Sequence, residues 1–221
     1  MTTNNQGVGT REIALMILLE IERGEKSHIV LRQVLEKYQY LSKQDRAFLT
    51  RLAEGTTERR IELDYIINQF SKVKTEKMKP VIRNILRCAV YQIKYMDQVP
   101  DSAACNEAVN LATRKGFKNL RGFVNGVLRN IARNIDKIAY PENTEEFLSI
   151  KYSMPQWIIR MWVRDYGEEK TKYILEGFYK ERATTIRING NATTKEELIR
   201  ELTGEGIQVK EHPLLASALL I

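Results

Sequence analysis

Hydrophobic residues recur every three or four positions through most of the first 138 residues, the spacing that places them on one face of an α-helix. No part of this stretch alternates between apolar and polar residues as a half-buried strand does. The pattern predicts an all-helical domain over residues 11–140. Its expected helices cover residues 11–23, 28–38, a segment from Ser42 to residue 54, and residues 61–70, 75–96, 103–115 and 119–135.

Single residues indicate where some of these helices begin and end. Ser42 is suited to cap the third helix, with Asp45 placed to reach back to it. Pro80 lies six residues into the segment 75–96, so we expect that helix to begin or kink there. The run Gly55-Thr56-Thr57 predicts a break between the third and fourth helices.

Pro141 and Asn143 mark a boundary, after which the composition of the chain changes. Residues 141–182 keep a helical spacing but are rich in aromatic side chains, and they contain both tryptophans, Trp157 and Trp162. Aromatic side chains at this density favour a seam for helix packing over a platform for base stacking. We therefore interpret residues 141–182 as a helical, aromatic-rich linker.

The period changes again after residue 183. Residues 184–189 alternate as a strand does, Thr193 or Thr194 can cap the helix that follows, and residues 207–209 are typical of a second strand. This order predicts a partial α/β subdomain over residues 183–221, the β-α-β start of a ferredoxin-like or RRM-like fold. The run LLASALLI closes the chain without a cap or a polar tail, so we expect a truncated chain. The fold class is therefore mainly α.

Composition and the N-terminus indicate a globular cytoplasmic protein. Residues 1–10 are polar and expected to be disordered, and the apolar run that follows is too short, and too soon closed by Glu20, for a membrane span or a signal peptide. Apolar content of 43% and charged content of 29% are ordinary. Cys88 and Cys105 lack CxxC spacing, which predicts reduced cysteines and no metal site.

The net charge of +7 is concentrated in one place. Residues 108–135 contain six basic residues and no acidic one, so they account for nearly all of the excess. A nearly neutral body with one basic patch favours a polyanionic partner such as nucleic acid. The lack of tryptophan beside the aliphatic residues of this stretch argues against a membrane surface.

The expected helix over residues 119–135 has an apolar face and an opposite face of polar residues at every fourth position. Gly122 and Gly126 share the polar face. Each costs a helix about 1 kcal/mol relative to alanine, but leaves a bare surface that a backbone or a phosphate can approach. The alternative is an ordinary solvated face. The predicted RNA-binding residues are Arg114, Lys115, Lys118, Arg121, Asn125, Arg129 and Arg133.

Catalytic and cofactor motifs are missing from the sequence. There is no G-x-G-x-x-G after a strand, no G-x-x-x-x-G-K-[ST], no G-x-S-x-G and no H-x-x-x-H. His28 and His212 have no evident partner, and the carboxylates are scattered over helix faces. We therefore expect no catalytic, cofactor-binding or metal-binding residue in this stretch.

Four helical motifs together resemble the NusB-like RNA-binding domain at the N-terminus of small-subunit ribosomal RNA cytosine-C5 methyltransferases of the RsmB (Sun/Fmu) type. They are DRAFLTRLAEGTTERR at 45–60, ILRCAVYQIKYMDQVP at 85–100, AACNEAVNLATRKG at 103–116 and FVNGVLR at 123–129. The segment LSIKYSMPQWIIRMWVRDYG at 148–167, followed by TTIRING, is similar to the linker into the catalytic half of those enzymes. The resemblance covers residues 10–221.

The resemblance implies a two-part enzyme, in which a NusB-like domain holds small-subunit ribosomal RNA and a Rossmann-like domain uses S-adenosylmethionine to methylate a cytosine. The family's two cysteines stand in Pro-Cys and Thr-Cys motifs. Here Cys88 stands in Arg-Cys-Ala and Cys105 in Ala-Cys-Asn, and the Gly-rich loop for the cofactor is missing. The resemblance therefore implies RNA binding by this stretch, with catalysis elsewhere.

Two other functions are compatible with the basic helix. One is a transcription antitermination factor of the NusB type, which binds RNA without catalysis. The aromatic linker and the β-α-β start after residue 141 argue against it, because such a factor needs neither. The other is a helical protein-interaction domain whose basic stripe is incidental.

Overall fold

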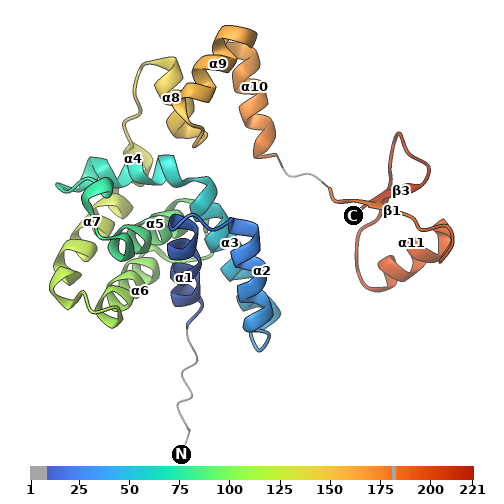
Figure 1. Ribbon diagram of the computed structural model, residues 1–221, viewed down its shortest axis with the longest axis horizontal. Coiled ribbons are helices and arrows are strands. Elements are labelled where there is room, and N and C mark those ends of the chain that lie inside the picture. Colours follow the sequence, from blue (N-terminus) through green and yellow to red (C-terminus); the bar gives the residue numbers. More distant parts are fainter. Residues whose placement is uncertain (1–8, 181–182) are drawn as a thin grey trace, which may run out of the picture. The chain divides into compact units, whose positions relative to one another are not determined.

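A computed structural model describes residues 9–180 and 183–221, in which the chain forms two compact units that divide at residue 172 (Figure 1). Most of the expected disordered segment 1–10 lies outside the described residues, and the first helix begins at Thr10. The larger unit contains α1 (Thr10–Glu22), α2 (Ser27–Lys37), α3 (Lys43–Glu58), α4 (Arg60–Phe70), η1 (Thr75–Lys77), α5 (Pro80–Tyr95), α6 (Asp101–Arg114), η2 (Lys118–Leu120), α7 (Arg121–Asn134), η3 (Ile135–Lys137), α8 (Thr144–Lys151) and α9 (Gln156–Tyr166).

The helix α5 is the centre of the larger unit, because α1, α3, α4, α6 and α7 all pack against it. Its residues Ile82, Ile85, Leu86, Ala89 and Val90 are almost completely buried. The described part of this unit contains no strand, which confirms the prediction of an all-helical fold. No helix among the described residues is both long enough and apolar enough to cross a membrane.

The helix-end signals are confirmed where they depend on neighbouring residues. The Ser42 hydroxyl accepts a hydrogen bond from the backbone N–H of Asp45 at 3.0 Å. Pro80 is the first residue of α5, so the segment 75–96 begins its α-helix there and not at residue 75. Residues Thr75–Lys77 form only a short 3₁₀ turn before it.

The predicted break at residues 55–57 is wrong, because α3 continues through Gly55 to Glu58. Gly55 is buried, and a methyl group at this position would overlap the aromatic ring of Tyr91 on α5. The glycine therefore allows α5 to pack closely against α3. Thr57 also lies within α3, where its hydroxyl donates to the carbonyl of Ala53 at 2.8 Å.

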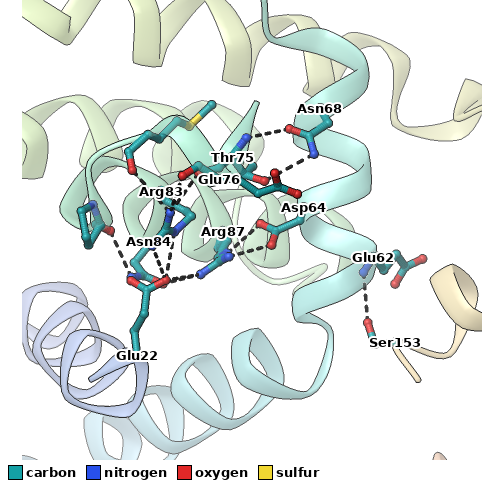
Figure 2. A network of polar contacts seen from close by, with 12 residues as sticks. Glu22, Glu62, Asp64, Asn68, Thr75, Glu76, Arg83, Asn84, Arg87 and Ser153 are labelled. Atoms are coloured by element: carbon teal, nitrogen blue, oxygen red, sulfur yellow. Dashed lines mark hydrogen bonds and ion pairs between the residues drawn. The ribbon is translucent and has the colours of Figure 1, made fainter. Parts of the chain in front are cut away.

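A polar network joins α1, α4 and α5 (Figure 2). The Glu22 carboxylate accepts from Arg83 at 2.6 Å and from Asn84 at 2.9 Å, while Arg87 donates to it at 3.2 Å. The Arg87 guanidinium also contacts both carboxylate oxygens of Asp64, at 2.6 and 2.7 Å. Arg87 is only 6% exposed, so its charge is stabilised by these two partners.

The buried carboxylate of Glu62, on α4, fixes the segment that follows the bundle. Lys94 donates to Glu62 Oε1 at 2.7 Å, and the Tyr140 hydroxyl donates to the same oxygen at 2.8 Å. The Tyr95 hydroxyl donates to Oε2. Burial and the Glu62 carboxylate raise the pKa of Tyr140, which keeps its hydroxyl protonated as a donor.

Backbone contacts extend this attachment to α8. The backbone N–H of Glu62 donates to the Ser153 hydroxyl at 3.1 Å (Figure 2), and Arg59 donates to the carbonyl of Lys151 at 3.1 Å. The hydroxyl of Tyr65 donates to the carbonyl of Ala139 at 2.8 Å. We use the name Glu62 clasp for these contacts together with the hydrogen bonds that Lys94, Tyr95 and Tyr140 donate to Glu62. It makes α8 part of the larger unit.

The aromatic residues of the linker divide into two groups. Tyr152 is buried, and Phe147 contacts Tyr140 edge to face, as the interpretation of a packing seam requires. On α9 and α10 (Glu168–Phe178), however, side chains that are at least half exposed are Trp157, Tyr166, Tyr173 and Phe178. The aromatic side chains near α8 thus pack as a seam, while α9 and α10 bury Ile159 and Leu175 and leave these four aromatic side chains largely exposed.

The smaller unit contains β1 (Thr185–Arg187), α11 (Lys195–Gly204), β2 (Lys210–Glu211) and β3 (Ala218–Leu220). Its sheet is antiparallel with the order β1-β3-β2, and Ile186 pairs with Leu219. A capping box between Thr194 and Glu197 starts α11, which confirms one of the two predicted caps. The run LLASALLI supplies β3, the middle strand.

The predicted strand at 207–209 is wrong, since β2 begins at Lys210. Gly206, two residues after the end of α11, has a left-handed conformation, and two backbone bonds close the last turn of the helix. Gly206 donates to Thr203 at 3.0 Å, and Ile207 donates to Leu202 at 3.0 Å. The N–H of Ile207 is therefore used by the helix end and is not available to the sheet.

Candidate nucleic-acid interface

The helices α6 and α7 pack against each other, and the turn between them is set by the sequence. Gly116 has a φ of +88° and follows the last turn of α6. Its N–H donates to Thr113, and the N–H of Phe117 donates to Ala112 at 2.9 Å. This is the hydrogen-bond pattern of a helix end closed by a left-handed glycine. The chain then passes through η2 into α7.

An open groove of about 690 Å³ lies where these three elements meet. We call it the α6–α7 groove. It contains both charged and amide side chains together with a bare glycine. Its lining residues are Asn106, Val109 and Asn110 from α6, Lys118 from η2, and Arg121, Gly122 and Asn125 from α7.

The helix α7 has the two faces that its sequence predicts. Val124, Leu128 and Ile131 are completely buried against the bundle. The polar face is solvent exposed at Arg121 and at the later arginines of the helix, and at both glycines. Apart from the helix's own backbone and the neighbouring residues, no atom of residues 9–180 and 183–221 lies within 4 Å of the place where a Cβ of Gly122 or Gly126 would stand, so packing there does not require these glycines.

Two of the seven predicted residues, Arg114 and Lys115, are paired within the molecule. Lys115 Nζ lies 2.6 Å from Glu12 of α1, and Arg114 Nε lies 3.7 Å from the same carboxylate. The Glu12 charge offsets part of the positive charge at the end of α6. Sequence reasoning missed this contact, because Glu12 lies about a hundred residues earlier in the chain.

Four cations of the predicted set form no ion pair within the part of the chain that the structure describes. All four have exposed side chains, and they follow the groove and the outer face of α7 in chain order. They are Lys118, Arg121, Arg129 and Arg133. Arg129 Nε donates to Asn125 Oδ1 at 2.9 Å, which orients the seventh predicted residue beside the groove.

The N-terminus of α7 adds to the positive potential of the groove. Leu120 caps the helix without a side-chain hydrogen bond, and the first turn contains no acidic residue. The first N–H groups of a helix are unpaired within it and carry a partial positive charge. The backbone N–H of Arg121 already donates to the carbonyl of Lys118, so the helix dipole adds to the charges of Lys118 and Arg121 without that N–H being free for an anion.

Sequence reasoning did not select Asn106, Val109 and Asn110, which form the α6 wall of the groove. The available signal was two asparagines one turn apart on a helix, because asparagine is a weak helix former. Their position opposite Arg121 depends on the packing of α6 on α7, which no local pattern reveals.

The two cysteines do not form a reactive site. Both are free and buried, as expected. Burial raises the pKa of the Cys88 thiol to about 12, and burial also raises the pKa of Cys105. A thiol with a raised pKa is a poor nucleophile, because the thiolate is the reactive form. No group of three potential metal ligands occurs among the described residues.

The described residues also do not fit a nucleotide-type cofactor such as S-adenosylmethionine. Such cofactors bind where a strand leads through a Gly-rich loop into the N-terminus of a helix. The strand β1 is followed by Asn189, Gly190 and Asn191, which line an open hollow of about 450 Å³. The next helix, α11, is closed by its own capping box and two glutamates, so its N-terminus is already occupied.

Two family patterns match the chain. The NusB family matches residues 9–133, and the ferredoxin-like domain described as "Methyltr_RsmF/B-like" matches residues 154–221. The first match contains the whole α6–α7 groove, and the second contains the small sheet.

Two curated relatives illustrate these matches. The probable ribosomal RNA small subunit methyltransferase B of Bacillus subtilis is 34% identical over 95% of this chain and 47% of its own length. The transcription antitermination protein NusB of Dictyoglomus thermophilum is 34% identical over 58% of this chain and 85% of its own length. The chain thus spans about half the length of the methyltransferase relative.

Solved structures agree with this fold. The crystal structure of PH0851 matches 96% of this chain and 47% of its own chain, with 22% identity and a TM-score of 0.67. A crystal structure of antitermination factors NusB and NusE with double-stranded RNA matches 57% of this chain and 94% of the compared chain, with 24% identity and a TM-score of 0.52. By these matches and its helical bundle, the chain belongs to the NusB family and carries an RsmF/B-like ferredoxin-like domain after its NusB domain.

Proposed function

We propose that this chain is the RNA-binding N-terminal portion of a small-subunit ribosomal RNA cytosine-C5 methyltransferase that uses S-adenosylmethionine. The observation that carries the proposal is the α6–α7 groove, whose cations lie exposed beside a helix N-terminus inside a NusB-family domain. The name of the B. subtilis relative gives the substrate class, and the solved NusB complex with double-stranded RNA supports RNA as the ligand.

In this proposal the exposed cations bind phosphates and position the RNA. The strongest contributors are Lys118, Arg121, Arg129 and Arg133, while Arg114 and Lys115 contribute less because Glu12 already pairs with them. We assign residues 11–140 to the RNA-binding domain, residues 141–182 to the linker and residues 183–221 to the partial subdomain. We further propose a cytoplasmic location, which suits ribosomal RNA as partner and two unpaired cysteines.

The test is RNA binding as a function of salt concentration. If four phosphates are neutralised, a plot of log affinity against log salt has a slope of about −3 to −4. Replacing Arg121 and Arg129 together by Glu should lower RNA affinity at least tenfold and should make the slope shallower by about 2. Fluorescence anisotropy with a labelled fragment of small-subunit ribosomal RNA measures both quantities.

The matched control reverses two exposed charges at α2, Lys26→Glu with Arg32→Glu, which changes the net charge equally. The helices α2 and α7 lie at opposite sides of the larger unit (Figure 1), so this variant should bind RNA within about threefold of the unchanged protein. Equal losses in both variants would show that net charge alone drives binding, and salt-independent binding would contradict the proposal.

The second candidate is an antitermination factor of the NusB type. The match to the D. thermophilum NusB favours an antitermination factor over a helical protein-interaction domain. That match leaves more than a third of this chain unmatched. The RsmF/B-like match over residues 154–221 favours the methyltransferase. A helical protein-interaction domain without RNA binding is tested by the same charge reversals, because it requires that RNA affinity stay unchanged.

A further inference from the structure

The α6–α7 groove contains uncharged polar groups that phosphate binding does not use. Three carboxamides line it, two from α6 and one from α7. Phosphate oxygens accept hydrogen bonds but never donate them, so cations and N–H groups are sufficient for a phosphate site. The carboxamides therefore point to a second part of the ligand that has both donors and acceptors.

Asn106 and Asn110 lie one helical turn apart on the exposed side of α6. Neither side chain has a hydrogen-bond partner within the described residues. Asparagine is a weak helix former, and no hydrogen bond among the described residues offsets this cost for Asn106 or Asn110 inside α6. Positions that weaken an element without internal compensation are expected at binding sites.

Asn125 faces the same groove from α7 and is held in place. Its Oδ1 accepts from Arg129 Nε at 2.9 Å, so the Nδ2 group keeps its two N–H donors. The three side chains together offer donors from both walls of the groove and acceptors from the α6 wall.

Gly122 lines the groove together with the charged and the amide groups. Space is open where its Cβ would stand, and a glycine in a helix interior is destabilising. Packing among the described residues does not require this glycine, whereas a ligand backbone that approaches α7 closely does.

We propose that Asn106, Asn110 and Asn125 recognise the 2′-hydroxyl of a ribonucleotide whose phosphate is held by Lys118 and Arg121, and that the groove thereby selects RNA over DNA. This rests on the proposed function. The 2′-hydroxyl both donates and accepts, as a carboxamide does, and it is the group that distinguishes the two nucleic acids. The cations supply affinity, and the carboxamides supply the choice of sugar.

The experiment compares three labelled oligonucleotides of one sequence, as RNA, DNA and 2′-O-methyl RNA, by anisotropy at several salt concentrations. The unchanged protein should bind RNA at least tenfold tighter than either of the others. In Asn106→Ala with Asn110→Ala, RNA affinity should fall about tenfold, DNA affinity should stay within twofold, and the salt slope should not change.

Two further variants separate recognition from folding. Asn130→Ala removes an exposed asparagine of α7 outside the groove lining and should leave the RNA to DNA ratio unchanged. Gly122→Ala should raise the thermal unfolding midpoint, yet it should weaken RNA binding at least fivefold, because its methyl group occupies the space of the ligand.

The outcomes distinguish the two proposals. If the unchanged protein shows no salt-dependent RNA binding, the proposed function fails. A second outcome is that the unchanged protein binds RNA with the expected slope, while Asn106→Ala with Asn110→Ala lowers the affinities for RNA and DNA equally or lowers neither. In that case the proposed recognition of the 2′-hydroxyl is wrong, and RNA binding stands.

Discussion

Gly55 shows how a single position can depend on a residue far away in the chain. The local sequence Gly55-Thr56-Thr57 is typical of a break, but the position is an interior turn of α3. Tyr91, which is 8% exposed, fills the space that a side chain at Gly55 would need. The glycine is a requirement of packing between α3 and α5, so a rule based on neighbouring residues gave the wrong answer.

Gly55→Ala should therefore destabilise the protein by about 2 kcal/mol, the usual range for overpacking a buried site. Urea unfolding followed by circular dichroism measures this free energy. Gly126→Ala is the matched control and should be neutral or stabilise by up to about 1 kcal/mol, because space is open there. Adding Tyr91→Leu should recover part of the Gly55→Ala loss, and strictly additive effects would show that the two residues do not clash.

The candidate site was partly predictable at this scale. Helical spacing alone selected Arg121, Asn125 and Arg129, because one face of a helix is fixed by its own sequence. The pairing of Lys115 with Glu12, and the wall that Asn106 and Asn110 form, depend on packing between helices. Contacts of that kind leave no periodic signal in the sequence.

Among the elements, those with local start and stop signals were predicted best. The Ser42 cap, the start at Pro80 and the Thr194 capping box each involve residues within three or four positions. The short strands were predicted less well. Residues 207–209 alternate correctly, but the end of α11 already uses the N–H of Ile207, and β2 contains only Lys210–Glu211.

The contact between α1 and α5 depends on a charge that acid can remove. Burial opposes ionisation of Glu22, but hydrogen bonds from Arg83 and Asn84 and the charge of Arg87 outweigh it, so its pKa lies below the usual 4.5. In the unfolded chain the carboxyl binds a proton more readily. Its contribution to stability is therefore complete above pH 4.5 and is lost as the pH falls through the lower, folded pKa.

Glu22→Gln should accordingly cost about 2 kcal/mol of unfolding free energy at neutral pH, with a smaller difference from the unchanged protein as the pH drops below 4.5. Urea unfolding at a series of pH values measures the difference. Glu25→Gln, at an exposed position nearby, should change stability by less than about 0.5 kcal/mol throughout. A Glu22→Gln difference that is independent of pH would contradict the role of its charge.

The molecule as a whole combines a NusB-family helical bundle, to which we assign RNA binding, with a small three-stranded sheet. Cys88 and Cys105 are both buried in the bundle. The described residues do not form a cofactor site of nucleotide type. The order of the two family domains was predictable, because the motifs that carry the resemblance follow one another along the sequence.

We therefore expect no methyl transfer by these 221 residues when they are incubated with small-subunit ribosomal RNA and S-adenosylmethionine labelled in its methyl group. The full-length B. subtilis relative serves as the positive control. Label in the RNA above background would show that a reactive site exists in this chain, and it would overturn the division into a binding part and a catalytic part.

The Glu62 clasp removes the flexibility that the segment from Asn134 to Ser153, directly after α7, would otherwise have. Twenty unattached residues, such as those from Asn134 to Ser153, would let their far end wander by about 25 Å. Because the clasp holds Ala139, Tyr140, Lys151 and Ser153 against α4 and α5, that freedom is removed. The chain that follows Ser153 therefore starts from a fixed point on the bundle, and any freedom of the smaller unit must arise after that residue.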